Sequence, residues 1–163
     1  MSEKKHIISM LVEDEPGVMT RISGMFARRG FNIDTITVGK TNKPGISKIV
    51  VTLIGDDSTL EQVEKQINKL VDVTKVSEMG SGIIRELCLI KIKTPNKKVK
   101  DELFDYAKVY KAKFVDVDHR SMTLEIIGVP EKIESFIEMV KAHGIIDISR
   151  TGVTAMSRGI INN

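Results

Sequence analysis

The sequence predicts an α+β protein with two consecutive ferredoxin-like βαββαβ domains, each a four-stranded antiparallel sheet with both helices on one face. Three observations carry this prediction. Strand and helix patterns follow the order β-α-β-β-α-β over about 75 residues, the same order returns in the second half, and Gly80-Ser81-Gly82 separates the copies. Right-handed crossovers then place both helices of a unit on one face. The expected domains are residues 1–80 and 81–163.

In the first domain, apolar and β-branched runs predict strands at residues 7–12, 32–38, 47–54 and 71–76. Two segments place apolar residues on one helical face: Val18, Ile22, Met25 and Phe26, then Leu60, Val63, Ile67 and Leu70. Pro16 follows acidic residues and is predicted at the first helical position. Asp56 is expected to help cap the second helix.

In the second domain, strands are predicted at residues 87–92, 114–117, 122–127 and 145–148, with a turn at residues 119–121. The helical faces are Val99, Leu103, Ala107 and Tyr110, then Ile133, Phe136, Ile137 and Val140. Residues 150–163 form a tail without clear periodicity. Units this small have thin cores and free sheet edges, so the sequence favours a homodimer.

Composition narrows the possible partners. The 163 residues include 41% hydrophobic, 29% charged and 4% aromatic residues with no Trp, and the formal net charge is +3. This is a soluble globular balance without the basic stripe or aromatic platform that nucleic-acid binding needs. No apolar run approaches a membrane span or a signal peptide, so a cytoplasmic protein without membrane contact is expected. The single cysteine, Cys88, is expected to be a buried thiol.

Motifs for catalysis or metal binding are not found in the sequence. His6, His119 and His143 have no metal-ligand spacing and are expected at the surface or at helix ends. The glycines at residues 80–82 are not followed by the Lys-Ser/Thr of a phosphate-binding loop. The same element order occurs in RNA-binding RRM domains, but residues 47–53 and 121–127 lack the aromatic residues of their RNA-binding strand. A catalytic chain and an RNA-binding chain are therefore both disfavoured.

The junction of the first strand and helix, Asp14-Glu15-Pro16-Gly17-Val18, is the remaining candidate site. Main-chain N–H groups at a helix start favour a carboxylate, and Gly17 allows a ligand to approach the main chain closely. With the Asn32 amide and an acidic side chain, these groups suit a zwitterion. A purely structural interpretation also stands, in which the acids cap the helix while Gly17 and Asn32 serve turns.

The blocks Asp14–Val18 and Arg29–Ile33 resemble an ACT domain, a regulatory module that binds amino acids. Further blocks at residues 69–73, 85–91 and 150–159 extend the similarity over nearly the whole chain. In this order they resemble the regulatory small subunit of acetohydroxyacid synthase (acetolactate synthase). One Asp-Glu-Pro-Gly-Val run would be a weak signal, whereas the ordered set is specific.

The resemblance implies a regulatory subunit that has no activity alone and activates a separate large subunit. That large subunit would carry thiamine diphosphate, Mg²⁺ and FAD and act in branched-chain amino-acid synthesis. Valine would bind between paired ACT domains and inhibit the complex. By motif position, its contacts fall on six residues: Asp14, Gly17, Val18, Met19, Asn32 and Ile33. Many family members have Asn in place of Asp14; an acid there accepts from an ammonium group but cannot donate to a carboxylate.

Two functional hypotheses therefore remain from the sequence. The first is the regulatory subunit just described, and the second is a free-standing ACT-type amino-acid sensor that acts on another partner. In both, the second domain is expected to serve the partner complex rather than bind the amino acid. Its first strand-to-helix connection, residues 94–99, has no glycine and places Lys97 and Lys98 where the first domain has acids. Those lysines would repel an ammonium group.

Overall fold

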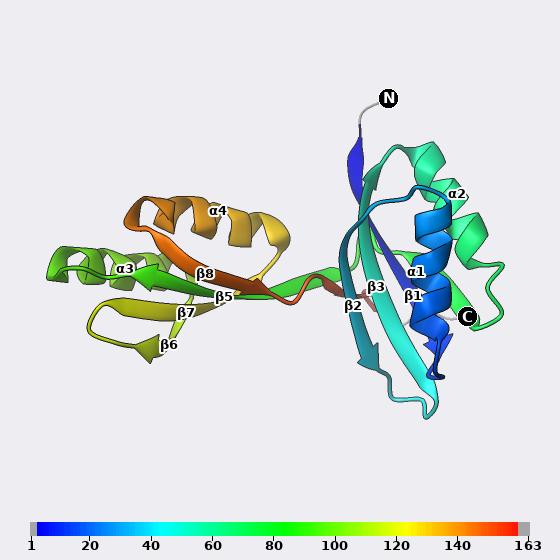
Figure 1. The fold of residues 1–163 in the computed structure, drawn as a ribbon, viewed down its shortest axis with the longest axis horizontal. Helices are drawn as coiled ribbons and strands as arrows, with labels where there is room; N and C mark the ends of the chain where they lie inside the picture. Colours follow the sequence, from blue (N-terminus) through cyan, green and yellow to red (C-terminus); the bar gives the residue numbers. More distant parts are fainter. Residues whose placement is uncertain (1–2, 160–163) are drawn as a thin grey trace. The chain divides into compact units, whose positions relative to one another are not determined.

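The computed structural model describes residues 3–159 and divides the chain into two compact units (Figure 1). The first unit extends to Ile83 and also takes in the segment that starts at Val153, while the second is Ile84–Gly152. The chain therefore passes between the units twice. The sequence places the tail in the second domain, whereas its contacts group residues 153–159 with the first unit.

The first unit is built from six elements: β1 (Lys4–Glu13), α1 (Val18–Arg28), β2 (Ile33–Lys40), β3 (Ile46–Gly55), α2 (Asp57–Ile67) and β4 (Val73–Glu78). Its four strands form an antiparallel sheet in the order β2-β3-β1-β4, with β2 and β4 at the edges. Both helices lie on one face of this sheet (Figure 1). The predicted ferredoxin-like fold is confirmed here.

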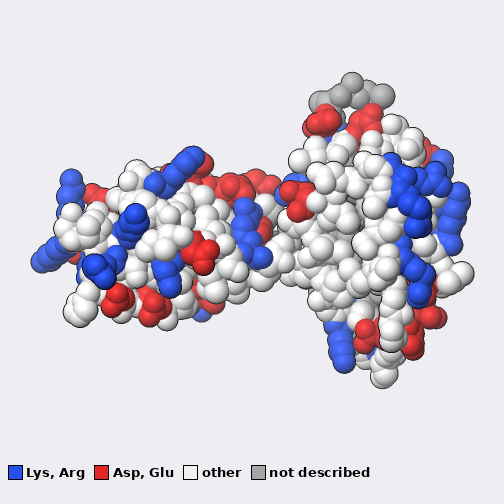
Figure 2. All heavy atoms as spheres, in the orientation of Figure 1, with Lys and Arg blue, Asp and Glu red and all other residues white. Residues whose placement is uncertain are grey.

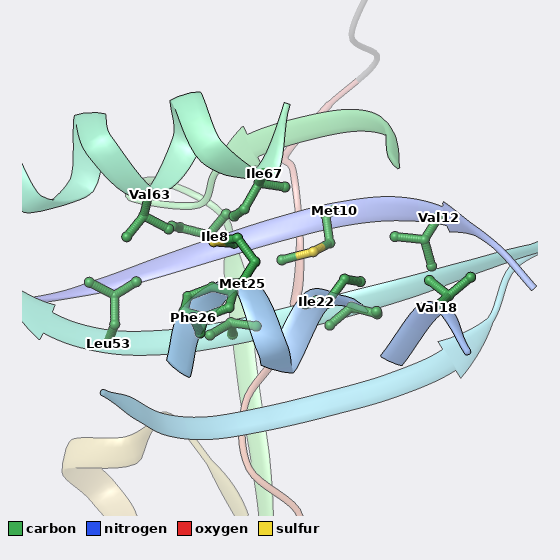
Figure 3. Close-up of a cluster of buried hydrophobic side chains, with 12 residues drawn as sticks. Ile8, Met10, Val12, Val18, Ile22, Met25, Phe26, Leu53, Val63 and Ile67 are labelled. Atoms are coloured by element: carbon green, nitrogen blue, oxygen red, sulfur yellow. The ribbon is translucent and has the colours of Figure 1, made fainter. Parts of the chain in front are cut away.

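Successive side chains of a strand point to opposite faces of the sheet, and this alternation determines which residues form the core of the first unit. Ile8, Met10 and Val12 are successive even positions of β1, so they share one face of the sheet. On that face they pack with the buried side of α1, including Ile22 and Phe26 (Figure 3). The apolar residues of α1 recur with a helical period of 3.6, and those of β1 occupy every second position. The two sets pack against each other, as the sequence predicts.

The second unit contains β5 (Ile83–Lys93), α3 (Lys97–Tyr110), β6 (Lys113–Val117), β7 (Ser121–Gly128), α4 (Pro130–Val140), a 3₁₀ turn (Lys141–His143) and β8 (Ile145–Arg150). Its strands follow the order β6-β7-β5-β8, which is again the ferredoxin-like order. A short strand from the tail, β9 (Thr154–Met156), also pairs with β5 and makes this a five-stranded sheet. Three residues are too few to show a strand period in the sequence.

Two local predictions are wrong. Pro16 is not in the helix, because α1 begins at Val18 with Gly17 at its N-cap position. His6 is buried rather than at the surface: its ring nitrogens lie 3.2 Å from the Gly55 carbonyl oxygen and 3.4 Å from a Glu78 carboxylate oxygen. Contacts with these polar partners offset the free-energy cost of burying the ring. Cys88 is buried as predicted, and burial raises the pKa of its thiol.

The N-cap of α2 predicts a pH dependence of stability. Hydrogen bonds from the Thr59 N–H and then the Ser58 and Thr59 hydroxyls lower the Asp56 pKa to about 2. Because the unfolded carboxyl has a pKa of about 3.9, this contribution is present above about pH 4 and is lost as the pH falls toward 2. Chemical denaturation should therefore show a steeper loss of stability over this range in wild type than in Asp56→Asn. Parallel curves would contradict the assignment.

Candidate ligand-binding site

The start of α1 leaves main-chain donors open. Gly17 adopts φ +88° and ψ −10°, a left-handed conformation that favours glycine, and no side chain caps the helix. By contrast, Asp56 and Asn96 cap α2 and α3 by accepting from the third N–H of each helix. Among the described residues, the N–H groups of Gly17, Met19 and Thr20 have no acceptor. Such a set of free donors at the positive end of a helix favours an anion.

Arg21 lies one helical turn beyond Gly17 and braces this helix start. Its guanidinium donates Nε to Oδ2 and Nη2 to Oδ1 of Asp72, both at 2.7 Å. The third nitrogen, Nη1, lies 3.1 Å from the point that a Cβ on Gly17 would occupy. Arg21 lowers the pKa of the nearly buried Asp72 carboxyl. The Asp72 carbonyl in turn accepts from the Glu13 N–H at 2.9 Å, so the end of β1 and the start of α1 are held together.

Arg21 is a site residue that was not predicted from the sequence. Arg21 follows Gly17 by four residues, and this spacing places the two residues next to each other on one face of the helix. Its partner Asp72 is 51 positions away along the chain, and nothing in the local pattern indicates that pairing. Arg21 is half exposed, so the helix start combines open N–H groups with an oriented cation.

The predicted residues near Gly17 contribute in different ways. Asp14 is exposed, and its own N–H donates to the Gly45 carbonyl at 2.9 Å. Met19 is also exposed, which leaves its side chain available to a ligand. Val18 is only 2% exposed and belongs to the core, so its side chain is not available. The structural interpretation of Asp14 and Glu15 as capping residues is wrong, because no side chain caps α1.

Asn32 and Ile33 lie at the far end of α1, where β2 begins. Asn32 is exposed, and its side-chain amide has no hydrogen-bond partner among the described residues. It lines a hollow of about 470 Å³ together with Arg29, Phe31 and Leu53, among others. Ile33 is half-buried and pairs with Leu53 of β3. An exposed amide without partners is free to bind a ligand, and it is not required for the turn.

The strand register separates the predicted residues into two groups. Asp14 is bonded to Gly45, while Ile33 is paired with Leu53. These β3-side positions are eight residues apart, about 26 Å at 3.3 Å per residue. The length of α1 also separates the two groups by more than one amino acid can span, since its 11 residues extend over roughly 16 Å. A single amino acid cannot contact Gly17 and Asn32 of the same chain.

Charges around the Gly17 group suit a zwitterion. Glu13, Asp14 and Glu15 are exposed beside the open N–H groups, and each can accept from an ammonium group. Basic side chains gather over α1 and α2 (Figure 2), and α1 itself contains no acidic residue. A ligand carboxylate at the start of α1 would lie near the open N–H groups and Arg21, and a ligand ammonium group would lie near the acids at residues 13–15. Among residues 3–159 there is no group of three or more His, Cys, Asp or Glu side chains that could hold a metal ion.

Comparison with known proteins covers both units. Residues 8–75 match the family described as the AHAS small subunit-like ACT domain, and residues 85–159 match the family described as the small subunit of acetolactate synthase. No helix within residues 3–159 is long and apolar enough to cross a membrane. The two family matches together span nearly all of the described chain.

Individual relatives agree with these matches. A probable acetolactate synthase small subunit of Methanothermobacter thermautotrophicus is 45% identical over 161 residues, covering 98% of this chain and 96% of the relative. The small subunit of Escherichia coli acetolactate synthase isozyme 3 is 35% identical, covering 95% and 96%. The crystal structure of the Thermotoga maritima acetolactate synthase small subunit is 40% identical, with a TM-score of 0.87, covering 97% and 99%.

Proposed function

Because this chain belongs to the family of acetolactate synthase small subunits, we propose that it activates a catalytic large subunit and makes it sensitive to inhibition by valine. On this proposal the chain performs no catalysis. The large subunit holds the thiamine diphosphate, Mg²⁺ and FAD. The chain acts in the cytoplasm as a homodimer. The observation that carries the ligand assignment is the uncapped start of α1, with its open N–H groups beside Arg21.

The carboxylate of the amino acid would accept from these N–H groups, with Arg21 as the nearby cation. Its ammonium group would donate to Asp14. This arrangement requires both charges of the ligand, because an anion alone would be repelled by the three acids at residues 13–15. The exposed Met19 side chain gives apolar contact for an aliphatic ligand.

A second copy of the chain would complete the site. β2 is an edge strand, and two copies related by a two-fold axis pair such strands antiparallel. The start of one β2 then lies beside the end of the other. Asn32 precedes the start of β2, and the hairpin that follows its end carries Gly45, which holds Asp14. Dimerisation through β2 therefore brings Asn32 of the partner subunit toward Gly17, and the ligand lies between two protomers.

Asn32→Ala is expected to weaken valine inhibition of the reconstituted two-subunit enzyme by at least about tenfold. The change removes one or two hydrogen bonds to charged groups, worth about 1.5–3 kcal/mol each. Activation of the large subunit and the melting temperature should stay near wild type, because the amide has no partner among residues 3–159. A valine titration of activity, with a thermal melt of each variant, checks this.

The matched control is Asn68→Ala. The Asn68 amide donates to the Glu64 carbonyl at 2.9 Å at the end of α2, so this change affects a local contact and not the proposed site. Its valine response should equal that of wild type. An unchanged valine response in Asn32→Ala would remove Asn32 from the site. A wild-type chain that does not activate a large subunit would instead favour a free-standing sensor.

A further inference from the structure

The face of the first sheet that lies away from the helices is covered by the tail. Odd positions of β1 and even positions of β3 point to this face, where Ser9 is paired with Val50. No helix of the first unit covers them, yet Ser9 is 4% exposed and Val50 is 2% exposed. Beside them, the Lys48 ammonium donates to the Ala155 carbonyl at 3.1 Å. The tail therefore lies on this face of the sheet.

The tail presents one side to the sheet and the other to solvent. Val153 is 1% exposed and Ala155 is 4% exposed, whereas Thr154 and Met156 between and after them are exposed. This alternation is that of a half-buried strand. Val153 and Ala155 are small enough for the main chain of the tail to approach the sheet closely.

A linker glycine fits the same contact. A Cβ on Gly82 would lie 2.9 Å from the Met156 carbonyl oxygen, closer than such atoms approach in proteins. Gly80 has open space around it instead. The two linker glycines therefore differ in role. Gly82 leaves room for the main chain of the tail, whereas Gly80 has no close neighbours among the described residues.

We propose that the face of the first sheet away from the helices is a peptide-binding surface, and that residues 153–157 of the same chain are its ligand. The tail is covalently continuous with the second unit, through Gly152, but belongs by its contacts to the first. It therefore gives the chain a second connection between the two units, in addition to residues 79–83. This proposal does not depend on which amino acid the α1 start binds.

Cleavage of the linker tests the proposal. A protease recognition sequence is inserted between Gly80 and Ser81 of the full chain, where there is open space, and the protein is cut under native conditions. The two fragments are expected to co-elute on size-exclusion chromatography. Separation of the fragments cut from the otherwise wild-type chain would overturn the proposal.

Substitutions in the tail sharpen the result. In Ala155→Asp a charge is placed on the buried side of the tail, and the cut fragments should separate. The matched control is Thr154→Asp, which places the same charge on the exposed neighbour and should leave the fragments together. A circular dichroism melt before cleavage establishes that each variant is folded. Co-elution of the Ala155→Asp fragments would show that the tail does not fasten the units.

Truncation of the tail provides a second, independent test of the proposal. A chain that ends at Gly152 lacks the tail, and one that ends at Gly159 keeps all of its described residues. After cleavage, the shorter chain should give separate fragments and the longer one should not. Equal behaviour of the two chains, whether both remain associated or both separate, would contradict the proposal.

Discussion

Gly17→Ala is expected to weaken valine binding to the purified chain by about a hundredfold or more. A left-handed backbone costs a residue with a Cβ about 1–2 kcal/mol, and here the Cβ would also lie 3.1 Å from Arg21 Nη1. Relief of this strain moves the open N–H groups. Loss of two hydrogen bonds to a carboxylate costs about 3 kcal/mol or more, which corresponds to about a hundredfold in affinity. Isothermal titration calorimetry measures the change directly.

Gly144→Ala is the control for adding a Cβ at a glycine with positive φ. Gly144 has φ +89°, close to the +88° of Gly17, whereas its ψ is 104° and that of Gly17 is −10°. A Cβ on Gly144 would also meet a basic side chain, Lys93, at 3.3 Å. It lies in the second unit, which is not expected to bind the amino acid. This variant should lose stability but keep the affinity of wild type for valine. Equal loss of affinity in both variants would mean that Gly17 acts through stability alone.

The sequence predicted the fold because its signals are local. The apolar positions of α1, from Val18 to Phe26, repeat at helical spacing, and the core of the first unit uses them on one face. Asp56 precedes a helical pattern in the same way, and the structure confirms it as an N-cap. These features depend on neighbours within one or two turns, so they can be read without the tertiary structure.

The pairings that the sequence did not predict join distant segments. Arg21 meets Asp72, Lys48 meets Ala155, and His6 lies between Gly55 and Glu78. Each contact depends on which strands become neighbours and in which register. The register also separates Gly17 from Asn32. The two residues flank a helix, so its predicted length already implies part of this separation.

Mixing of two variants tests most directly whether the site is shared between protomers. Gly17→Ala and Asn32→Ala each damage every site of their own homodimer. In a mixed dimer, one site would combine Gly17 of one chain with Asn32 of the other and be intact. Random pairing makes about half of the dimers mixed, so about a quarter of the sites should recover.

The measurement is a valine titration by calorimetry. The two variants are unfolded together in equal amounts and refolded, and the valine concentration saturates wild type but neither variant. A site shared between two protomers predicts binding with wild-type affinity at about a quarter of the wild-type stoichiometry. Binding in the mixture that equals the average of the two separate variants would contradict a site shared between two protomers.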